Sequence, residues 1–209
     1  MYIPAHFHET DLGKLDWLAA HDAFGTLISL NEGAPIATHM PVLYRRTGGQ
    51  VTLTGHWARQ NPQWPAIEGQ RALFIFHGPH AYISPRWYAN PAANVPTWDY
   101  ATAHLYGQAR LIQDVARIEE VVAALAAHYE AGAAEPWRMS ATLPREQLLR
   151  GIIGFELVVD DIQLKFKLNQ NHPPANVTGT IAALQAQGGE DATAVAALMK
   201  QALDKRPRP

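Results

Sequence analysis

A succession of short β-type segments joined by tight turns most constrains what this chain can fold into. Residues 24–30 have the composition of a strand, Asn31-Glu32-Gly33 is typical of a tight turn, and residues 35–44 fit the returning strand. A second turn, Thr47-Gly48-Gly49-Gln50, precedes an alternating segment at residues 51–56. Because such short turns join antiparallel neighbours, these segments predict a sheet built from hairpins.

The rest of the chain extends this sheet and adds helices. The strongly apolar residues 71–76 predict a central strand, and further strands are expected over residues 98–111, 152–159 and 162–168, the last two on either side of Asp160-Asp161. Helices are predicted over residues 12–20, 115–129 and 146–149, and in the alanine-rich tail from Asn176, which Gly188-Gly189 interrupts. Since strands and helices do not alternate, the fold class is mainly β or α+β: a small antiparallel barrel or a strongly twisted antiparallel sheet, with peripheral helices.

Composition limits the function classes. The chain has 209 residues, 47% of them hydrophobic, which suffices for a buried core. A net charge of -2 gives no overall attraction to nucleic acid or to an anionic membrane. The absence of cysteine excludes disulfides, thiolate catalysis and sulfur-ligated metals. No signal peptide or apolar run of about 18 residues is recognisable, so we expect a cytoplasmic protein without a membrane span.

The middle third of the chain concentrates residues that suit a ligand site better than a core. Four of the six Trp and five of the ten His lie between His39 and His104, set among Gly, Pro, Asn and Arg. Rigid aromatic faces, imidazoles and a guanidinium among turn residues predict a site for a flat, charged ligand. The same region contains a proline-rich stretch, Gly78 to Pro96, which we expect to be a long functional loop without assigning its task.

Individual motifs in this region each allow two interpretations. Arg59 and Asn61 follow a strand and could bind a phosphate, or Arg59 could be a surface cation and Asn61 a helix cap. His77 and His80 have a spacing that could hold a metal, but no nearby Asp, Glu or Cys completes a ligand set, so no metal site is predicted. The stretch Lys165 to Asn171 is either a solvated strand end or a source of cations and amides for a phosphate or a carbonyl-rich ring.

Sequence signatures of common catalytic sites are missing. There is no Gly-rich phosphate loop, dinucleotide fingerprint, nucleophile elbow or zinc signature, and Glu68 and Asp99 are isolated carboxylates rather than an acid-base pair. A helix-turn-helix with a basic recognition face is not recognisable either, so DNA binding does not follow from the sequence. The basic cluster Lys200, Lys205, Arg206 and Arg208 is interpreted as a solvated tail. No catalytic residue is assigned.

Taken together, the motifs resemble one family. They are Phe24-Gly25-Thr26-Leu27, Thr38-His39-x-Pro41, Gly55-His56-x-Ala58-Arg59-x-Asn61-Pro62-Gln63-Trp64, Gly78-Pro79-His80-Ala81-Tyr82-Ile83-Ser84-Pro85-x-Trp87-Tyr88, Val95-Pro96-Thr97-Trp98-x-Tyr100, Gly154-Phe155-Glu156 and Lys165-x-Lys167-Leu168-x-Gln170-Asn171. Their order and spacing, from Met1 to about Ala183, resemble the PaiB-like family of FMN-binding negative transcriptional regulators. The departures are Asn169, where a small hydroxyl residue is expected, and His172, where Arg is expected.

The resemblance implies a fold, a cofactor and a set of ligands. The fold would be the antiparallel split β-barrel of pyridoxamine-phosphate-oxidase-like flavoproteins, usually a homodimer with FMN at the subunit interface. The loop of Arg59 and Asn61 would hold the FMN phosphate, and residues 98–100 would border the isoalloxazine. The full set of implied cofactor-binding residues is Thr38, His39, His56, Ala58, Arg59, Asn61, Trp98, Tyr100, Lys165, Lys167, Gln170 and Asn171, the last four from the same or the partner chain.

Domains and function follow from the same resemblance. Residues 1–171 would form the FMN-binding domain, and residues 172–209 a helical C-terminal extension. The implied function is that of a homodimeric regulatory or sensory flavoprotein, a repressor in transcription regulation. An alternative is an FMN-dependent oxidoreductase that reduces a flavin or another small molecule without binding DNA. A third interpretation is a carrier of another planar ligand such as haem, which the histidines would favour.

Overall fold

The computed structural model describes residues 1–137, 140 and 142–206, and these form two compact units. Unit 1 consists of Met1–Leu18, His77–Ala103 and Gln163–Pro209, and unit 2 of Ala19–Phe76 and His104–Ile162. Neither unit is a continuous stretch of sequence, because three long strands contribute residues to both. The expected organisation, an FMN-binding domain at residues 1–171 with a helical extension of the same domain at residues 172–209, stays a prediction.

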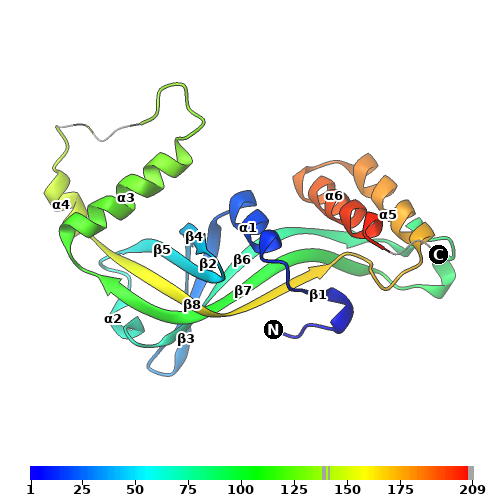
Figure 1. Ribbon diagram of the computed structural model, residues 1–209, viewed down its shortest axis with the longest axis horizontal. Helices are drawn as coiled ribbons and strands as arrows, with labels where there is room; N and C mark the ends of the chain where they lie inside the picture. The colour runs from blue at the N-terminus through cyan, green and yellow to red at the C-terminus, as the bar shows by residue number, and fades with distance from the viewer. Residues whose placement is uncertain (138–139, 141, 207–209) are drawn as a thin grey trace. The chain divides into compact units, whose positions relative to one another are not determined.

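One sheet contains the strands, in the order β3-β2-β6-β7-β8-β5-β4, with β1 paired to β8 (Figure 1). The strands are β1 (His8–Glu9), β2 (Phe24–Asn31), β3 (Ala34–Pro41), β4 (Leu43–Thr47), β5 (Gln50–Ala58), β6 (Arg71–Ile83), β7 (Thr97–Ile112) and β8 (Ile152–Lys167). The pairings of β2 with β3 and β6, of β5 with β4 and β8, and of β1 with β8 are antiparallel. The expected antiparallel sheet is confirmed.

Helices flank these strands. They are α1 (Leu12–His21), α2 (Trp64–Ile67), α3 (Val115–Tyr129), α4 (Arg145–Arg150), α5 (Pro174–Gln187) and α6 (Glu190–Asp204), with short 3-10 helices at Ala5–Phe7, Pro85–Trp87 and Pro91–Ala93. The predicted cap of α3 is present, since the Asp114 carboxylate accepts a hydrogen bond from the Arg117 amide at 2.9 Å. Among the described residues, no helix is long and apolar enough to cross a membrane.

The core of unit 2 is aromatic. Alternate residues of β5 are buried, and the ring of Trp57 lies 4.5 Å from that of Phe155, centroid to centroid. Gly55 faces the same ring, where an added Cβ would come within 2.8 Å of Phe155. The aromatic packing therefore requires a glycine at the strand position that precedes His56.

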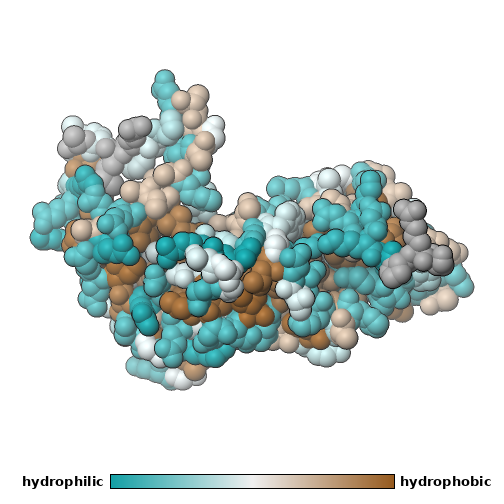
Figure 2. Space-filling view, viewed as in Figure 1, coloured by the Kyte–Doolittle hydropathy of each residue, from teal (hydrophilic) through white to brown (hydrophobic). Residues whose placement is uncertain are grey.

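The core of unit 1 includes α5 and α6, which lie side by side (Figure 1). Both helices bury apolar residues, including Val177 and Leu184 of α5 and Val195 and Met199 of α6. The outer surface of α6 is largely hydrophilic, as Figure 2 shows. The break between the helices falls at Gly188 and Gly189, whose φ angles of 70° and 88° favour glycine.

Two sequence-based element boundaries are wrong. Strand β6 continues to Ile83 and buries Pro79, Ala81 and Ile83, so the expected loop of residues 78–96 starts only after β6. The sequence misled because proline is rare inside a strand. Residues 152–168 were expected to form two strands, but β8 is continuous through Asp160 and Asp161. Arg71 pairs with both carboxylates, at 2.9 and 3.6 Å, and offsets the charge that suggested a turn.

The C-terminal basic cluster also differs from expectation. Arg206 is only partly exposed, and its guanidinium donates through Nη1 to the His172 carbonyl at 2.9 Å and through Nη2 to the Asn169 carbonyl at 3.2 Å. Arg208 lies outside the described residues. The end of α6 is thus attached to the turn that follows β8.

Candidate functional site

The predicted cofactor-binding residues fall into two groups, one in each unit. Unit 2 holds Thr38, His39, His56, Ala58, Arg59 and Asn61. Unit 1 holds Trp98, Tyr100, Lys165, Lys167, Gln170 and Asn171. Each group is described by itself below.

In unit 2, the turn after β5 brings Thr38 and Asn61 together. The Asn61 Nδ2 donates to the Thr38 hydroxyl at 3.0 Å, and the Asn61 Oδ1 accepts from the Gln63 backbone amide at 2.8 Å. The Thr38 hydroxyl keeps its proton for a further hydrogen bond. The expected proximity of these two residues is therefore present, with Thr38 only partly exposed.

Arg59 lies on the same turn and is anchored rather than mobile. Its backbone amide donates to the Gly151 carbonyl at 2.8 Å, its Nε to the Arg150 carbonyl at 2.7 Å and its Nη2 to the Ile152 carbonyl at 3.2 Å. Its Nη1 has no hydrogen-bond acceptor among the described residues, and the side chain is exposed. Arg59 thus holds the turn against the start of β8. Its guanidinium is fixed in place, and Nη1 can still donate hydrogen bonds to a ligand.

The two histidines of this group have different surroundings. His39 is the next residue on β3 and points to the opposite face, where its Nδ1 lies 2.9 Å from the Thr26 hydroxyl. His56 is partly buried, and burial lowers the pKa of its imidazole. The buried His56 Nδ1 has no hydrogen-bond partner in the described part of the chain. Buried polar atoms are rarely left so, and a ligand is one way of satisfying them.

Gln63 is a positioning residue to which the sequence motifs assigned no role. It is completely buried, and its Oε1 accepts from the Trp57 indole at 3.1 Å. Its Nε2 is within 3.1 to 3.2 Å of the Leu27 carbonyl, the Ser29 hydroxyl and the Ile36 carbonyl. One side chain therefore connects β2, β3, β5 and the turn that carries Arg59 and Asn61. Its place between Pro62 and Trp64 was the only sequence signal.

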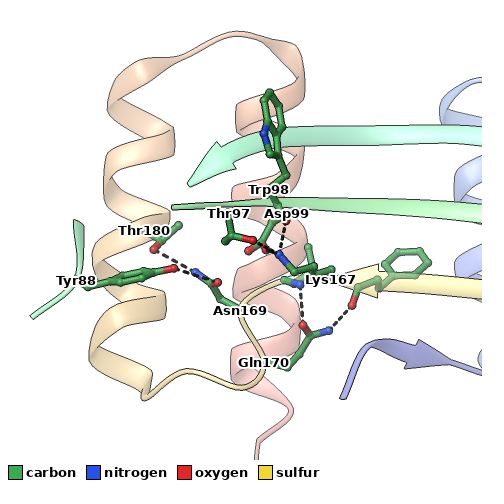
Figure 3. A network of polar contacts seen from close by, with 10 residues as sticks. Tyr88, Thr97, Trp98, Asp99, Lys167, Asn169, Gln170 and Thr180 are labelled. Atoms are coloured by element: carbon green, nitrogen blue, oxygen red, sulfur yellow. Dashed lines mark hydrogen bonds and ion pairs between the residues drawn. The ribbon is translucent and has the colours of Figure 1, made fainter. Parts of the chain in front are cut away.

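In unit 1, Lys167 and Gln170 are used within the fold (Figure 3). The Lys167 ammonium donates to the Thr97 hydroxyl and the Trp98 carbonyl, and it lies 3.3 Å from the Asp99 carboxylate. Gln170 donates to the Phe166 carbonyl at 2.5 Å and accepts from the Leu168 amide at 2.6 Å. Both side chains shape the end of β8, and the expectation that they contact a cofactor stays a prediction.

Lys165, Tyr100 and Trp98 present a different surface. The Lys165 side chain is buried, with its ammonium 5.1 Å from the centre of the Tyr100 ring and 5.8 Å from that of Tyr2. It has no hydrogen bond or ion pair with another described residue. Trp98 is 54% exposed, and its ring centroid lies 6.0 Å from those of both His80 and Tyr82. The aromatic side chains expected at this position are therefore accessible.

The remaining predicted residues contribute less. Ala58 ends β5 in an exposed position and offers only backbone atoms, and the exposed Asn171 side chain has no partner among the described residues. His80 lies 3.7 Å from the Asp191 carboxylate at the start of α6. No group of three or more His, Asp or Glu in the described part of the chain could hold a metal ion.

The buried Asp99 should make stability depend on pH. Burial raises the pKa of its carboxyl from 3.8 to about 6, although Lys167 opposes the shift. Between these values the native state binds more protons than the unfolded state, so the free energy of unfolding falls as pH rises, by on the order of 3 kcal/mol. Asp99→Asn should remove this fall. Urea denaturation of both proteins from about pH 4 to about pH 7 measures it; parallel profiles would contradict the assignment.

Comparisons with known proteins identify a family and a fold. Residues 1–161 match the family described as "Putative FMN-binding domain". The chain is 36% identical over 209 residues to "Protease synthase and sporulation protein PAI 2" of Bacillus subtilis (strain 168), covering 99% of this chain and 100% of that protein. The flavocytochrome Anf3 from Azotobacter vinelandii superposes with a TM-score of 0.59 and 16% identity, covering 79% of this chain and 72% of that one. The FAD and haem binding protein from Mycobacterium smegmatis gives a TM-score of 0.57 and 19% identity, with 88% and 80% covered.

These likenesses define first a class and then a family. The fold is the antiparallel split β-barrel of flavin-binding proteins, with peripheral helices and a helical C-terminal segment, as expected from the sequence. The chain belongs to the FMN-binding domain family, and its resemblance to the PaiB-like proteins is confirmed. FMN is therefore the cofactor.

Proposed function

We propose that this protein is a homodimeric regulatory or sensory flavoprotein of the negative transcriptional regulator type. The observation that carries the proposal is the turn after β5, where Asn61 binds the Thr38 hydroxyl and Arg59 keeps one nitrogen unused, in a chain of the FMN-binding family. The full-length likeness to a protein named for protease synthesis and sporulation supports a regulatory role. A cytoplasmic location is part of the same proposal.

The residues of unit 2 fit the phosphate end of FMN. The unused Nη1 of Arg59 and the hydroxyl of Thr38 are donors beside a backbone turn, an arrangement that suits a phosphate. The unpartnered Nδ1 of His56 is a second polar atom for which the described residues provide no partner. Asn61 holds Thr38 in place rather than being free itself. In this proposal Arg59 and Thr38 bind the phosphate, and Asn61 and Gln63 orient the turn.

The flavin would supply the redox chemistry, and the protein its binding and orientation. Isoalloxazine accepts and donates electrons or hydride when bound, which serves a sensor as well as an enzyme. Trp98 offers an exposed aromatic face suited to a planar ring, whereas the Tyr100 ring is partly buried, with the Lys165 ammonium 5.1 Å from its centre. The alternative function is therefore an FMN-dependent oxidoreductase that does not contact DNA.

Spectroscopy of the purified full chain tests the proposal. FMN binding should give the visible flavin spectrum, with FMN identified by mass after release, and the loaded protein should sediment as a dimer. Salt-sensitive, sequence-dependent binding to promoter DNA would support the regulator. Bleaching of the flavin by NAD(P)H without DNA binding would instead establish the oxidoreductase. A colourless protein that cannot be loaded with FMN would sink both.

Arg59→Ala should show whether Arg59 contacts the phosphate of FMN or its ring. Losing one charge-assisted hydrogen bond should weaken FMN by about 10- to 100-fold and leave riboflavin, which lacks the phosphate, nearly unchanged. Fluorescence titration with both flavins measures the ratio. Arg150→Ala is the matched control, because the Arg150 guanidinium is exposed and pairs with Glu146 at 2.5 Å. Equal losses for both flavins would show that Arg59 acts only by holding the turn.

A further inference from the structure

A cavity of about 300 Å³ lies in unit 1 beside the network of Figure 3. Its lining residues are Ala93, Asn94, Val95, Thr97, Lys167, Asn169, Asn171 and His172. None of them is acidic, and most carry an amide, hydroxyl, imidazole or ammonium group. The volume is at the lower end of the range for small-molecule sites. The cavity therefore suits a small ligand that accepts hydrogen bonds.

Two cations act on this cavity from different elements. Lys167 of β8 lines it, and Arg206, beyond α6, binds the carbonyls of Asn169 and His172. The pKa of His172 is lowered by burial first and then by both cations, so the imidazole is neutral in a positive field. Asp99 offsets the charge of Lys167, whereas Arg206 has no carboxylate partner among the described residues. The charge of Arg206 therefore leaves the electrostatic potential at the cavity positive.

The donors are held open by the surrounding fold. The His172 ring lies 4.8 Å from the Tyr88 ring, and the Tyr88 hydroxyl donates to the Asn169 side chain at 3.3 Å. Asn169 takes a left-handed backbone conformation, with φ of 57°, and is fixed further by Thr180 at 3.4 Å (Figure 3). The ring nitrogens of His172 and the amide of Asn171 have no hydrogen-bond partner in the described part of the chain. Packing against Tyr88 thus holds the His172 ring in place, while the exposed Asn171 amide is available to a ligand.

We propose that this cavity is a binding site for the carboxylate or phosphate group of a small molecule, with His172 and Asn171 as donors and Arg206 as the uncompensated cation. The site goes beyond the proposed function, since its donors and its cation come from the turn after β8 and from the residue beyond α6, all of which follow the family match at residues 1–161. Either the phosphate of FMN or a separate metabolite carries the anion.

Titration of the full chain with inorganic phosphate tests the site. NMR follows the His172 ring and the Asn171 amide at constant ionic strength maintained with sodium chloride, in the presence and absence of FMN. His172→Phe keeps a ring against Tyr88 but removes both nitrogens, and Asn171→Leu removes the amide. Each should weaken phosphate by about 10-fold or more. His128→Phe is the matched control, because His128 lies exposed on α3 with its ring 5.0 Å from that of Tyr129.

The flavin affinities identify the source of the anion. If His172→Phe also weakens FMN but not riboflavin, the cavity holds the phosphate of FMN and the assignment of that phosphate to Arg59 and Thr38 is wrong; if both flavins are unaffected, the cavity holds a separate anion. Two results would overturn the proposed site. In the first, neither substitution changes the binding of phosphate or of FMN. In the second, the wild type binds no phosphate, and neither residue is needed for FMN binding. A protein that binds phosphate here but no flavin would contradict only the proposed function.

Discussion

Lys167→Met is expected to lower the free energy of unfolding by about 3 to 5 kcal/mol, one of the two largest effects anticipated for this chain. Asp99 is completely buried, and Lys167 is its ion-pair partner at 3.3 Å. Removing the ammonium leaves a buried carboxylate and the Trp98 carbonyl without their donor. Urea denaturation near neutral pH, where the carboxyl is ionised, measures the loss.

Two further variants isolate the pair. Lys200→Met removes an exposed lysine of α6 and should change stability by less than about 0.5 kcal/mol. Asp99→Asn combined with Lys167→Met should recover part of the loss, because no buried charge then remains. A Lys167→Met protein as stable as the wild type would mean that Asp99 is satisfied in another way, and would weaken the description of Lys167 as a structural residue.

Gln63→Leu is expected to lower the free energy of unfolding by about 3 kcal/mol, because it removes a side chain with four hydrogen-bond partners. The Trp57 indole and the carbonyls of Leu27 and Ile36 would be left unpaired in the interior of unit 2. The loss should appear in urea denaturation. It should be accompanied by weaker FMN binding, because Gln63 also fixes the turn that carries Arg59 and Asn61.

Gln60→Leu is the control for this substitution. Gln60 lies on the same turn, three residues earlier, and is exposed. The substitution should leave both stability and FMN binding close to those of the wild type. If Gln63→Leu were equally harmless, the network around Gln63 would not position the turn, and the proposed phosphate site would lose its support.

Local chemistry explains which features of the fold were predictable. Turns such as Asn31-Glu32-Gly33, and the capping residue Asp114, act through neighbouring backbone atoms, so the hairpins and α3 could be recognised. Pro79 inside β6 and the acidic pair of β8 oppose local preference. They are stabilised by partners distant in the chain, such as Arg71 for the two carboxylates.

For the candidate site, too, some features could be predicted from the sequence and others could not. The motifs correctly indicated the family and the cofactor, because residue types in order are visible in a sequence, whereas the roles of Thr38, Arg59 and Asn61 stay predictions. The motifs could not show which of Lys165 and Lys167 has an ammonium group available for a ligand, because both are lysines of the same strand. Only the burial of Asp99 against Lys167 shows which ammonium is already used.

By itself, then, the sequence determined an antiparallel flavin-binding fold of a known family, since periodicity, turns and motifs are local. The tertiary structure decided which polar groups remain available: Nη1 of Arg59, Nδ1 of His56, and the donors of Asn171 and His172 beside Arg206. A hydrogen-bonding group is available for a ligand only when no other part of the chain satisfies it. That condition depends on residues far apart in sequence, and only the folded chain brings them together.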